Sequence, residues 1–236
     1  AFHHVNWKKC LVNIIDTPGD ANFIADTHNS LQAADGSILV IEATSGVQVI
    51  TEKVWHYLNE FKLPRLIVIN KLDRENSDFY ATLDNIKNKL KINPLALQIP
   101  IGREADFKGV VDLVKMKGFV FADDESGDFK ESEIPDDCRE QAAAQRQKMV
   151  EDIAEAHEEL LEKFLDGQEL SPEEISTGIK KGILNQTLIP VLCGSALSNI
   201  GIKTIMDAVV EYLPSPLDRE ALEVLDLKTK EKKKLE

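Results

Sequence analysis

The sequence has little cysteine and no long apolar run. Its three cysteines include no Cys-x-x-Cys pair, so we expect no thiolate metal site and interpret them as reduced thiols of a cytoplasmic protein. The apolar runs are far too short to cross a bilayer, and residues 1–9 lack the apolar stretch of a signal peptide. We therefore expect no membrane partner.

Excess negative charge is confined to one segment of the chain. The formal net charge is −13 at pH 7, and residues 123–174 contain nineteen Asp or Glu but only five Lys or Arg. The rest of the chain is nearly neutral. Because the acidic segment repels phosphate groups, we expect no direct, sequence-specific nucleic acid binding. A solubilising surface is its simplest interpretation.

Short runs rich in Ile and Val alternate with helical patterns. Such runs suit buried strands of a parallel sheet, and they lie at 10–15, 37–41, 66–69 and 188–192. Apolar residues recur at helical spacing over 54–61, 79–90 and 202–213. This alternation predicts an α/β, doubly wound sheet. We also expect residues 1–7 to pair with the run at 10–15 through Lys8-Lys9.

The alternation breaks in the middle of the chain. Short strand patterns at 110–114 and 118–122 precede a long helical pattern over 149–164, and Ser171-Pro172-Glu173-Glu174 carries the signature of a capping box. We interpret this part as an inserted α+β subdomain. The predicted division is a sheet domain at 1–102, the inserted subdomain at 103–187, the last strand and helix of the sheet domain at 188–217, and a linker or tail at 218–236.

The first candidate motif is Asp16-Thr17-Pro18-Gly19, which directly follows an apolar run. Ligands of open α/β sheets bind beyond the carboxyl ends of the strands. Asp16 at such a position can hold Mg²⁺ through water, since Mg²⁺ prefers oxygen ligands and keeps several waters. Gly19 has no Cβ, so its N–H can approach a phosphate oxygen closely. An ordinary turn after a strand is the structural alternative.

The second motif is Asn70-Lys71-Leu72-Asp73, which follows the run at 66–69. Asp73 can accept hydrogen bonds from the ring N–H and the exocyclic amine of guanine, a donor pair that adenine lacks. The stem of Lys71 can lie along the base plane, and Asn70 can tie neighbouring loops together. A polar strand-to-helix turn is the alternative.

The third motif is Gly194-Ser195-Ala196, which follows the run at 188–192. Small residues there let a backbone N–H reach the guanine O6 atom. Taken in order, the three motifs form the pattern of Ras-like GTPases. The Gly-x-x-x-x-Gly-Lys-Ser/Thr pattern of the phosphate-binding loop does not occur. We therefore expect an incomplete Ras-like sheet without its N-terminal phosphate-loop unit, and weak or absent binding of GTP, GDP and Mg²⁺ by this chain alone.

At the level of longer segments, the sequence resembles the guanine-nucleotide-binding domain of elongation factor G-like translational GTPases. The resemblance covers about residues 5–218 and rests on the segments 12–40, 45–49, 64–74, 100–104 and 193–217. It implies a cytoplasmic, multidomain factor that acts on the ribosome and hydrolyses GTP with Mg²⁺. It also implies that the inserted subdomain contacts a ribosomal stalk protein, which gives the acidic segment a protein partner.

One residue departs from the family pattern. The family has Asp-Thr-Pro-Gly-His, where the His positions the attacking water, whereas this sequence has Asp20. The resemblance therefore implies a divergent paralogue, with Asp16 to Gly19 at the phosphate and Mg²⁺ end, Asn70, Lys71 and Asp73 as the guanine reader, and Ser195 and Ala196 as the O6 loop. The alternative is a non-catalytic ribosome- or protein-binding relative.

Overall fold

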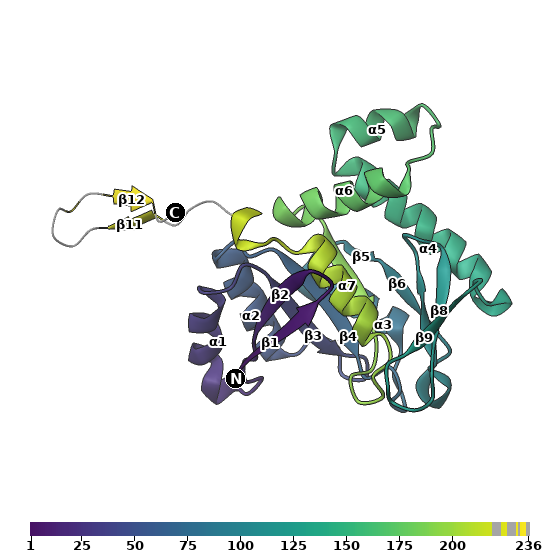
Figure 1. Ribbon diagram of the computed structural model, residues 1–236, viewed down its shortest axis with the longest axis horizontal. Coiled ribbons are helices and arrows are strands. Elements are labelled where there is room, and N and C mark those ends of the chain that lie inside the picture. The colour runs from purple at the N-terminus through teal and green to yellow at the C-terminus, as the bar shows by residue number, and fades with distance from the viewer. Residues whose placement is uncertain (219–222, 226–229, 231, 235–236) are drawn as a thin grey trace.

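The computed structural model describes residues 1–218, 223–225, 230 and 232–234 (Figure 1). Within these residues the strands form two four-stranded sheets and two two-stranded hairpins. One four-stranded sheet is parallel and the other is antiparallel. The predicted α/β class is confirmed.

The parallel sheet carries the strands that precede two of the three motifs. Its order is β3 (Ser37–Glu42), β4 (Arg65–Asn70), β10 (Ile189–Cys193) and β5 (Pro94–Ala96). Strand β4 is central and buried at every position except its last. In register, Glu42 lies opposite Asn70, and Cys193 lies opposite Ile69. Three strands therefore end at one edge of the sheet, where the loops that follow them can meet.

Two helices of this sheet begin at clear capping signals. Helix α2 (Val49–Glu60) opens with a capping box between Gln48 and Thr51, and α3 (Phe79–Leu90) opens with Asp78, whose side chain accepts a hydrogen bond from Ala81 N. Helix α7 (Ile202–Tyr212) follows β10. Helices α3 and α7 match the patterns predicted over 79–90 and 202–213 closely, whereas α2 begins at Val49, five residues before the pattern predicted over 54–61.

The N-terminal strands form a separate hairpin, so the prediction that the run at 10–15 is a buried parallel strand is wrong. Among the described strands, β1 (Phe2–Trp7) and β2 (Cys10–Ile15) pair only with each other, and Leu11 is 59% exposed. Periodicity alone cannot separate a hairpin strand from a buried one. The hairpin lies beside α7 (Figure 1), where Trp7 Nε1 donates to Asp207 Oδ1 at 2.7 Å. The predicted pairing through Lys8-Lys9 is confirmed.

The antiparallel sheet occupies the middle of the chain. Its order is β6 (Gln98–Ile101), β7 (Gly109–Asp112), β8 (Lys117–Phe121) and β9 (Phe129–Ser132), with the short 3-10 helix η2 (Glu104–Asp106) between β6 and β7. Three helices follow, namely α4 (Asp136–Glu155), α5 (Glu158–Leu165) and α6 (Pro172–Leu184). The sheet thus begins at Gln98, and the division of the chain at residue 103 stays a prediction.

The long helical pattern over 149–164 is two helices rather than one. Helix α4 ends at Glu155, and His157 has extended backbone at φ −141° before α5 begins. The His157 Nε2 atom lies 2.7 Å from Gly178 O of α6, a tertiary contact that accompanies the break and that the local pattern could not reveal. The capping box of α6 is confirmed, because Ser171 Oγ accepts from Glu174 N at 3.2 Å and Glu174 Oε2 accepts from Ser171 N at 2.9 Å.

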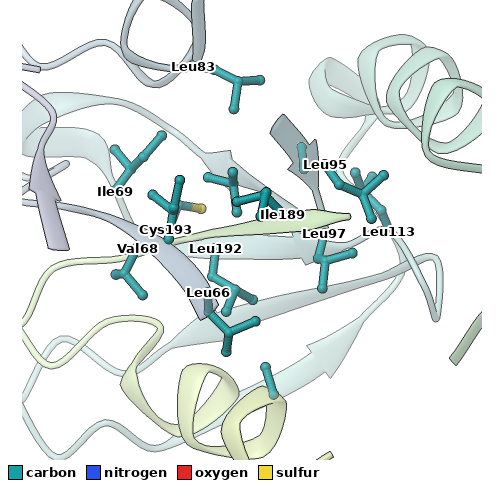
Figure 2. Packing of buried hydrophobic residues seen from close by; sticks show 14 of the residues in the cluster. Leu66, Val68, Ile69, Leu83, Leu95, Leu97, Leu113, Ile189, Leu192 and Cys193 are labelled. Atoms are coloured by element: carbon teal, nitrogen blue, oxygen red, sulfur yellow. The ribbon is translucent and has the colours of Figure 1, made fainter. Parts of the chain in front are cut away.

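The buried apolar residues of both sheets form one continuous cluster. Figure 2 shows Leu66, Val68 and Ile69 of β4 near Leu192 and Cys193 of β10, with Leu95, Leu97 and Leu113 farther along. The two sheets are joined where Leu113 N donates to Leu97 O at 3.0 Å. The parallel strands that carry the motif loops therefore rest on a core that extends into the antiparallel sheet.

The C-terminal part is described only in pieces. The 3-10 helix η3 (Pro216–Asp218) ends the continuous segment, and β11 (Glu223–Leu225) pairs antiparallel with β12 (Lys232–Lys234). The other residues of the predicted tail at 218–236 lie outside the described residues, apart from Lys230. No helix in the described ranges is long and apolar enough to cross a membrane.

Candidate functional site

Two of the three predicted motifs meet at the carboxyl edge of the parallel sheet. Asn70 Oδ1 accepts a hydrogen bond from Ala196 N at 2.9 Å. Leu72 N donates to Gly194 O at 3.4 Å, and Gly194 N donates to Ile69 O at 3.0 Å. The loops at 70–73 and 194–196 are thus fastened to each other, and Asn70 ties them together as its position in the sequence suggested.

Asp73 presents one carboxylate oxygen that has no partner. Its Oδ2 atom accepts from Ser198 Oγ at 3.2 Å, whereas its Oδ1 atom is buried and has no hydrogen-bond partner within the described structure. A buried acceptor without a donor is costly, by about 1–3 kcal/mol, and such an atom calls for an explanation. A ligand that brings an N–H group to Oδ1 would remove this cost. The residues present therefore fit guanine, which offers two adjacent donors.

Lys71, in the loop at 70–73, is linked to the end of β3. Its backbone is left-handed, at φ 66°, and its Nζ forms an ion pair with the Glu42 carboxylate. Hydrogen bonding to Lys71 lowers the pKa of Glu42. Ala43 N also donates to Asn70 O at 2.9 Å, so this end of β3 is joined to the motif by its backbone as well. Lys71 is therefore held beside the end of β3, and its side chain is 40% exposed.

The loop after β10 is closed by a small backbone bridge. Ser195 is fully buried, and it exchanges two backbone hydrogen bonds with Ile200, at 2.9 and 3.0 Å. Gly194 is required here, since a Cβ at this position would lie 2.6 Å from Ile200 O. The preceding Cys193 is fully buried, and burial raises the pKa of its thiol, so it is an inert core residue.

The amides of this loop are not all free. Ala196 N is engaged by Asn70 Oδ1, whereas Leu197 N donates no hydrogen bond within the described structure. Leu197 is 73% exposed. In this arrangement, the amide open to an acceptor such as a guanine O6 belongs to Leu197, and Ala196 would serve only if Asn70 released it.

The first motif lies apart from the other two. Residues 16–20 follow the hairpin strand β2, and Asp16 N pairs with Ala1 O at 2.9 Å. Thr27 Oγ1 donates to Pro18 O at 3.3 Å. Among the described residues, no hydrogen bond or ion pair connects residues 16–20 to the loops at 70–73 and 194–196. The loops at 70–73 and 194–196, called the base loops below, are therefore joined by hydrogen bonds to each other but not to Asp16-Thr17-Pro18-Gly19.

Gly19 and Asp20 are both exposed. A Cβ added to Gly19 would meet nothing within 4 Å, so the packing of this protein does not itself require glycine there. The Asp20 side chain caps the 3-10 helix η1 (Ala21–Phe23), which precedes α1 (Ile24–Leu31), by accepting from Asn22 N at 2.8 Å. Asp20 thus has a local structural role.

The donor set for a metal is sparse. In the described residues, no group of three or more His, Cys, Asp or Glu could hold a metal ion. Asp16 supplies one exposed carboxylate. Mg²⁺ is typically held by one or two carboxylates together with waters and substrate phosphates, so a single carboxylate is compatible with that ion and with little else.

Two residues at the site are not evident from the sequence. Ser198 contacts Asp73, and Glu42 contacts Lys71. Ser198 belongs to no motif, and its contact depends on how the loop folds back at Ile200. Glu42 could have been suspected, because it ends a strand at the edge of the sheet where ligands bind.

A family model described as the elongation factor Tu GTP-binding domain matches residues 1–215 of the chain. The chain belongs to this family. Guanine nucleotide binding is the property for which the family is named, and it agrees with the geometry of the loops at 70–73 and 194–196. The resemblance found in the motifs is thereby confirmed as membership of the translational GTPase family.

The relatives narrow this assignment to elongation factor G-like proteins. Elongation factor G of Thermotoga petrophila is 44% identical over 212 residues, which cover 90% of this chain and 30% of that protein. Elongation factor G of Thermotoga maritima is also 44% identical over 212 residues, 90% of this chain and 31% of the relative. This GTP-binding domain thus spans less than a third of the relatives that it matches.

A solved structure supports the same fold. The crystal structure of a protein from Thermus thermophilus matches with a TM-score of 0.86 and 30% sequence identity, covering 94% of this chain and 33% of that one. The fold of this chain therefore recurs within a longer chain.

Proposed function

We propose that this GTP-binding domain recognises guanine through Asp73, Lys71 and the loop at 194–197. The observation that carries the proposal is the Asp73 Oδ1 atom, which is buried and unpartnered beside the bond between Asn70 and Ala196. Guanine would present its ring N–H and its amine to the Asp73 carboxylate, whereas adenine offers no such donor pair. The apolar stem of Lys71 would lie along the base plane.

The remaining base contact is assigned to the loop amides. The Leu197 N–H is open to the O6 atom as the loop stands, and the Ala196 N–H would reach it after release by Asn70. The buried Ser195 holds this loop in place through its two backbone hydrogen bonds with Ile200. Specificity for guanine over adenine would then come from two sides of the ring.

At the phosphate end we assign Asp16 to Mg²⁺, through water, and Thr17, Pro18 and Gly19 to the γ-phosphate region. Mg²⁺ supplies charge neutralisation to phosphate oxygens when bound. The open space around Gly19 leaves its N–H accessible to an anion. Because the sequence has no phosphate-loop pattern, we expect this chain alone to bind GTP or GDP weakly and to hydrolyse little GTP.

The broader role is carried over from the relatives. We propose that the protein acts as a translational GTPase on the ribosome, in the cytoplasm, and that the acidic part of the 103–187 region meets a stalk protein. Helix α4 supports a charge-driven contact, since its first turn carries Asp136 and Asp137, both exposed. The non-catalytic alternative is favoured by one observation, the capping role of Asp20 at the position of the family's His.

Base choice in the Asp73→Asn variant tests the proposal. The experiment is a competition between GTP and xanthosine triphosphate for the longest protein encoded by the reading frame that contains this chain. Xanthine has a carbonyl where guanine has its amine, and an Asn amide can donate to that carbonyl. Hydrogen bonds to a charged group contribute about 1.5–3 kcal/mol, so GTP affinity should fall by roughly 10- to 100-fold.

Asp84→Asn is the matched control, because Asp84 is an exposed residue of α3. This variant should keep the affinities of the unaltered protein. If Asp73→Asn left the GTP affinity unchanged, Asp73 would not be part of the base site.

A further inference from the structure

A chain of hydroxyl groups runs from the buried end of the base loop to the Asp73 carboxylate. Ser195 Oγ lies 3.4 Å from Ser198 Oγ, and Ser198 Oγ lies 3.2 Å from Asp73 Oδ2. Ser198 N also donates to Ser195 Oγ at 3.3 Å. Ser195 is fully buried and Ser198 is half-buried.

The direction of these hydrogen bonds follows from the donors available. Ser198 Oγ donates to Asp73 Oδ2, so the single hydroxyl proton of Ser198 is used there. The proton of Ser195 is then the one shared with Ser198 Oγ, while Ser195 Oγ accepts from Ser198 N. Both hydroxyl groups thus donate in the direction of Asp73. The two backbone hydrogen bonds between Ser195 and Ile200 fix the position of Ser195.

The two oxygens of the Asp73 carboxylate therefore have different environments. Rotation of a carboxylate about its last side-chain bond is broad, with no single strongly preferred angle, so an external contact is needed to fix its plane. Ser198 holds Oδ2 and thereby leaves Oδ1 as the atom without a partner. Oδ2 retains a further lone pair, so both oxygens can still face the two donors of a guanine ring.

We propose that Ser198 is a positioning residue that sets the guanine selectivity of the domain by orienting the Asp73 carboxylate. The inference rests on the proposed role of Asp73 in base recognition. Ser198 does not touch the base in this account. Its loss would free the carboxylate to rotate, so the contact to the exocyclic amine, which depends on the carboxylate plane, would suffer most.

Selectivity between GDP and inosine diphosphate measures this effect, because hypoxanthine keeps the ring N–H and O6 of guanine but lacks the amine. The dissociation constants of both nucleotides are measured on the longest protein encoded by the reading frame, unaltered and with Ser198→Ala or Ser198→Thr. We expect Ser198→Ala to reduce the preference for GDP about tenfold. Ser198→Thr keeps the hydroxyl and should restore most of the preference.

Thermal unfolding of each variant separates positioning from folding, since a merely structural role would lower stability and weaken both nucleotides equally. An unchanged ratio of the two dissociation constants in Ser198→Ala would overturn the inference, whether or not both affinities fell. If that ratio were unchanged while Asp73→Asn still switched the base choice, only the role of Ser198 would be lost. If the unaltered protein showed no preference for GDP, the proposed function would fail together with this inference.

Discussion

Replacement of Arg65 should destabilise the sheet that carries both base loops. Arg65 begins β4 and is only 2% exposed. Its guanidinium donates hydrogen bonds to two backbone oxygens, Leu63 O at 3.1 Å and Leu58 O at 3.2 Å. It also donates to two side-chain oxygens, Asn59 Oδ1 at 2.8 Å and Gln186 Oε1 at 3.1 Å. It also stacks on the Trp55 ring at 4.5 Å, and burial lowers its pKa to about 10. Arg65 thus ties the start of β4 to the end of α2 and to the segment that leads into β10. The carboxyl ends of β4 and β10 carry the loops at 70–73 and 194–196.

The cost of Arg65→Met depends on which acceptors find new partners. Leu58 O keeps its bond from Leu63 N, and the oxygen of Asn59 can face water because that side chain is exposed. Leu63 O is left buried without a donor, at about 1–3 kcal/mol. Loss of the contact with Trp55 adds about 0.5–2 kcal/mol. Relief of a buried charge offsets part of this total.

We therefore expect Arg65→Met to lower the free energy of unfolding by roughly 1–4 kcal/mol, a fall in Tm of about 2–16 °C for a chain of this size. Arg103→Met is the matched control, since the Arg103 side chain is 73% exposed and forms only a surface ion pair with Asp78 at 3.2 Å. That change should cost less than about 1 kcal/mol. Thermal unfolding followed by circular dichroism measures both variants. Equal Tm values for them would refute the role given to Arg65.

Two further predictions concern carboxylates. Asp20→His, in the longest protein encoded by the reading frame, should raise ribosome-stimulated single-turnover GTP hydrolysis at least about tenfold if a water-positioning group is missing. It should also cost about 0.5–2 kcal/mol of stability, because the cap to Asn22 N is lost. Equal or slower hydrolysis would show that Asp20 is no weakness. Burial raises the pKa of Asp112, so the folded state binds the Asp112 proton more tightly than the unfolded state does. The ionised carboxylate therefore lowers the free energy of unfolding at neutral pH. This destabilisation fades as the pH falls through the raised pKa. Asp112→Asn keeps an oxygen for Val114 N and Lys115 N and should raise Tm at pH 7, with a smaller gain at pH 4. A gain that grew on acidification would contradict this assignment.

The base loops could be predicted from sequence because each follows a strand with an unambiguous pattern. The strands that precede Asn70 and Gly194 are almost wholly apolar and buried, and parallel strands end at a common edge. Local sequence therefore sufficed to bring these two loops together. The link between Asn70 and Ala196 then follows from short side chains at neighbouring strand ends.

Other features are not evident from the local pattern of the sequence. The apolar run at 10–15 resembles a buried strand, but among the strands that the structure describes it pairs only with β1. Arg65 is buried although a basic residue at the start of a strand suggests a surface position, because its acceptors come from α2 and from Gln186. Ser198 reaches Asp73 only after the loop turns back at Ile200. The contacts of Arg65 with Gln186 and of Ser198 with Asp73 join distant parts of the chain and have no local signature.

The most direct test of guanine recognition is a titration of the 236-residue chain with GDP and with ADP, followed by the amide chemical shifts of the protein. Weak binding calls for millimolar nucleotide. We predict that GDP shifts the amides of Asp73, Ala196 and Leu197, and that ADP leaves them unchanged. Equal shifts with the two nucleotides, or GDP-induced shifts confined to other parts of the molecule, would contradict the assignment of these loops as a guanine site.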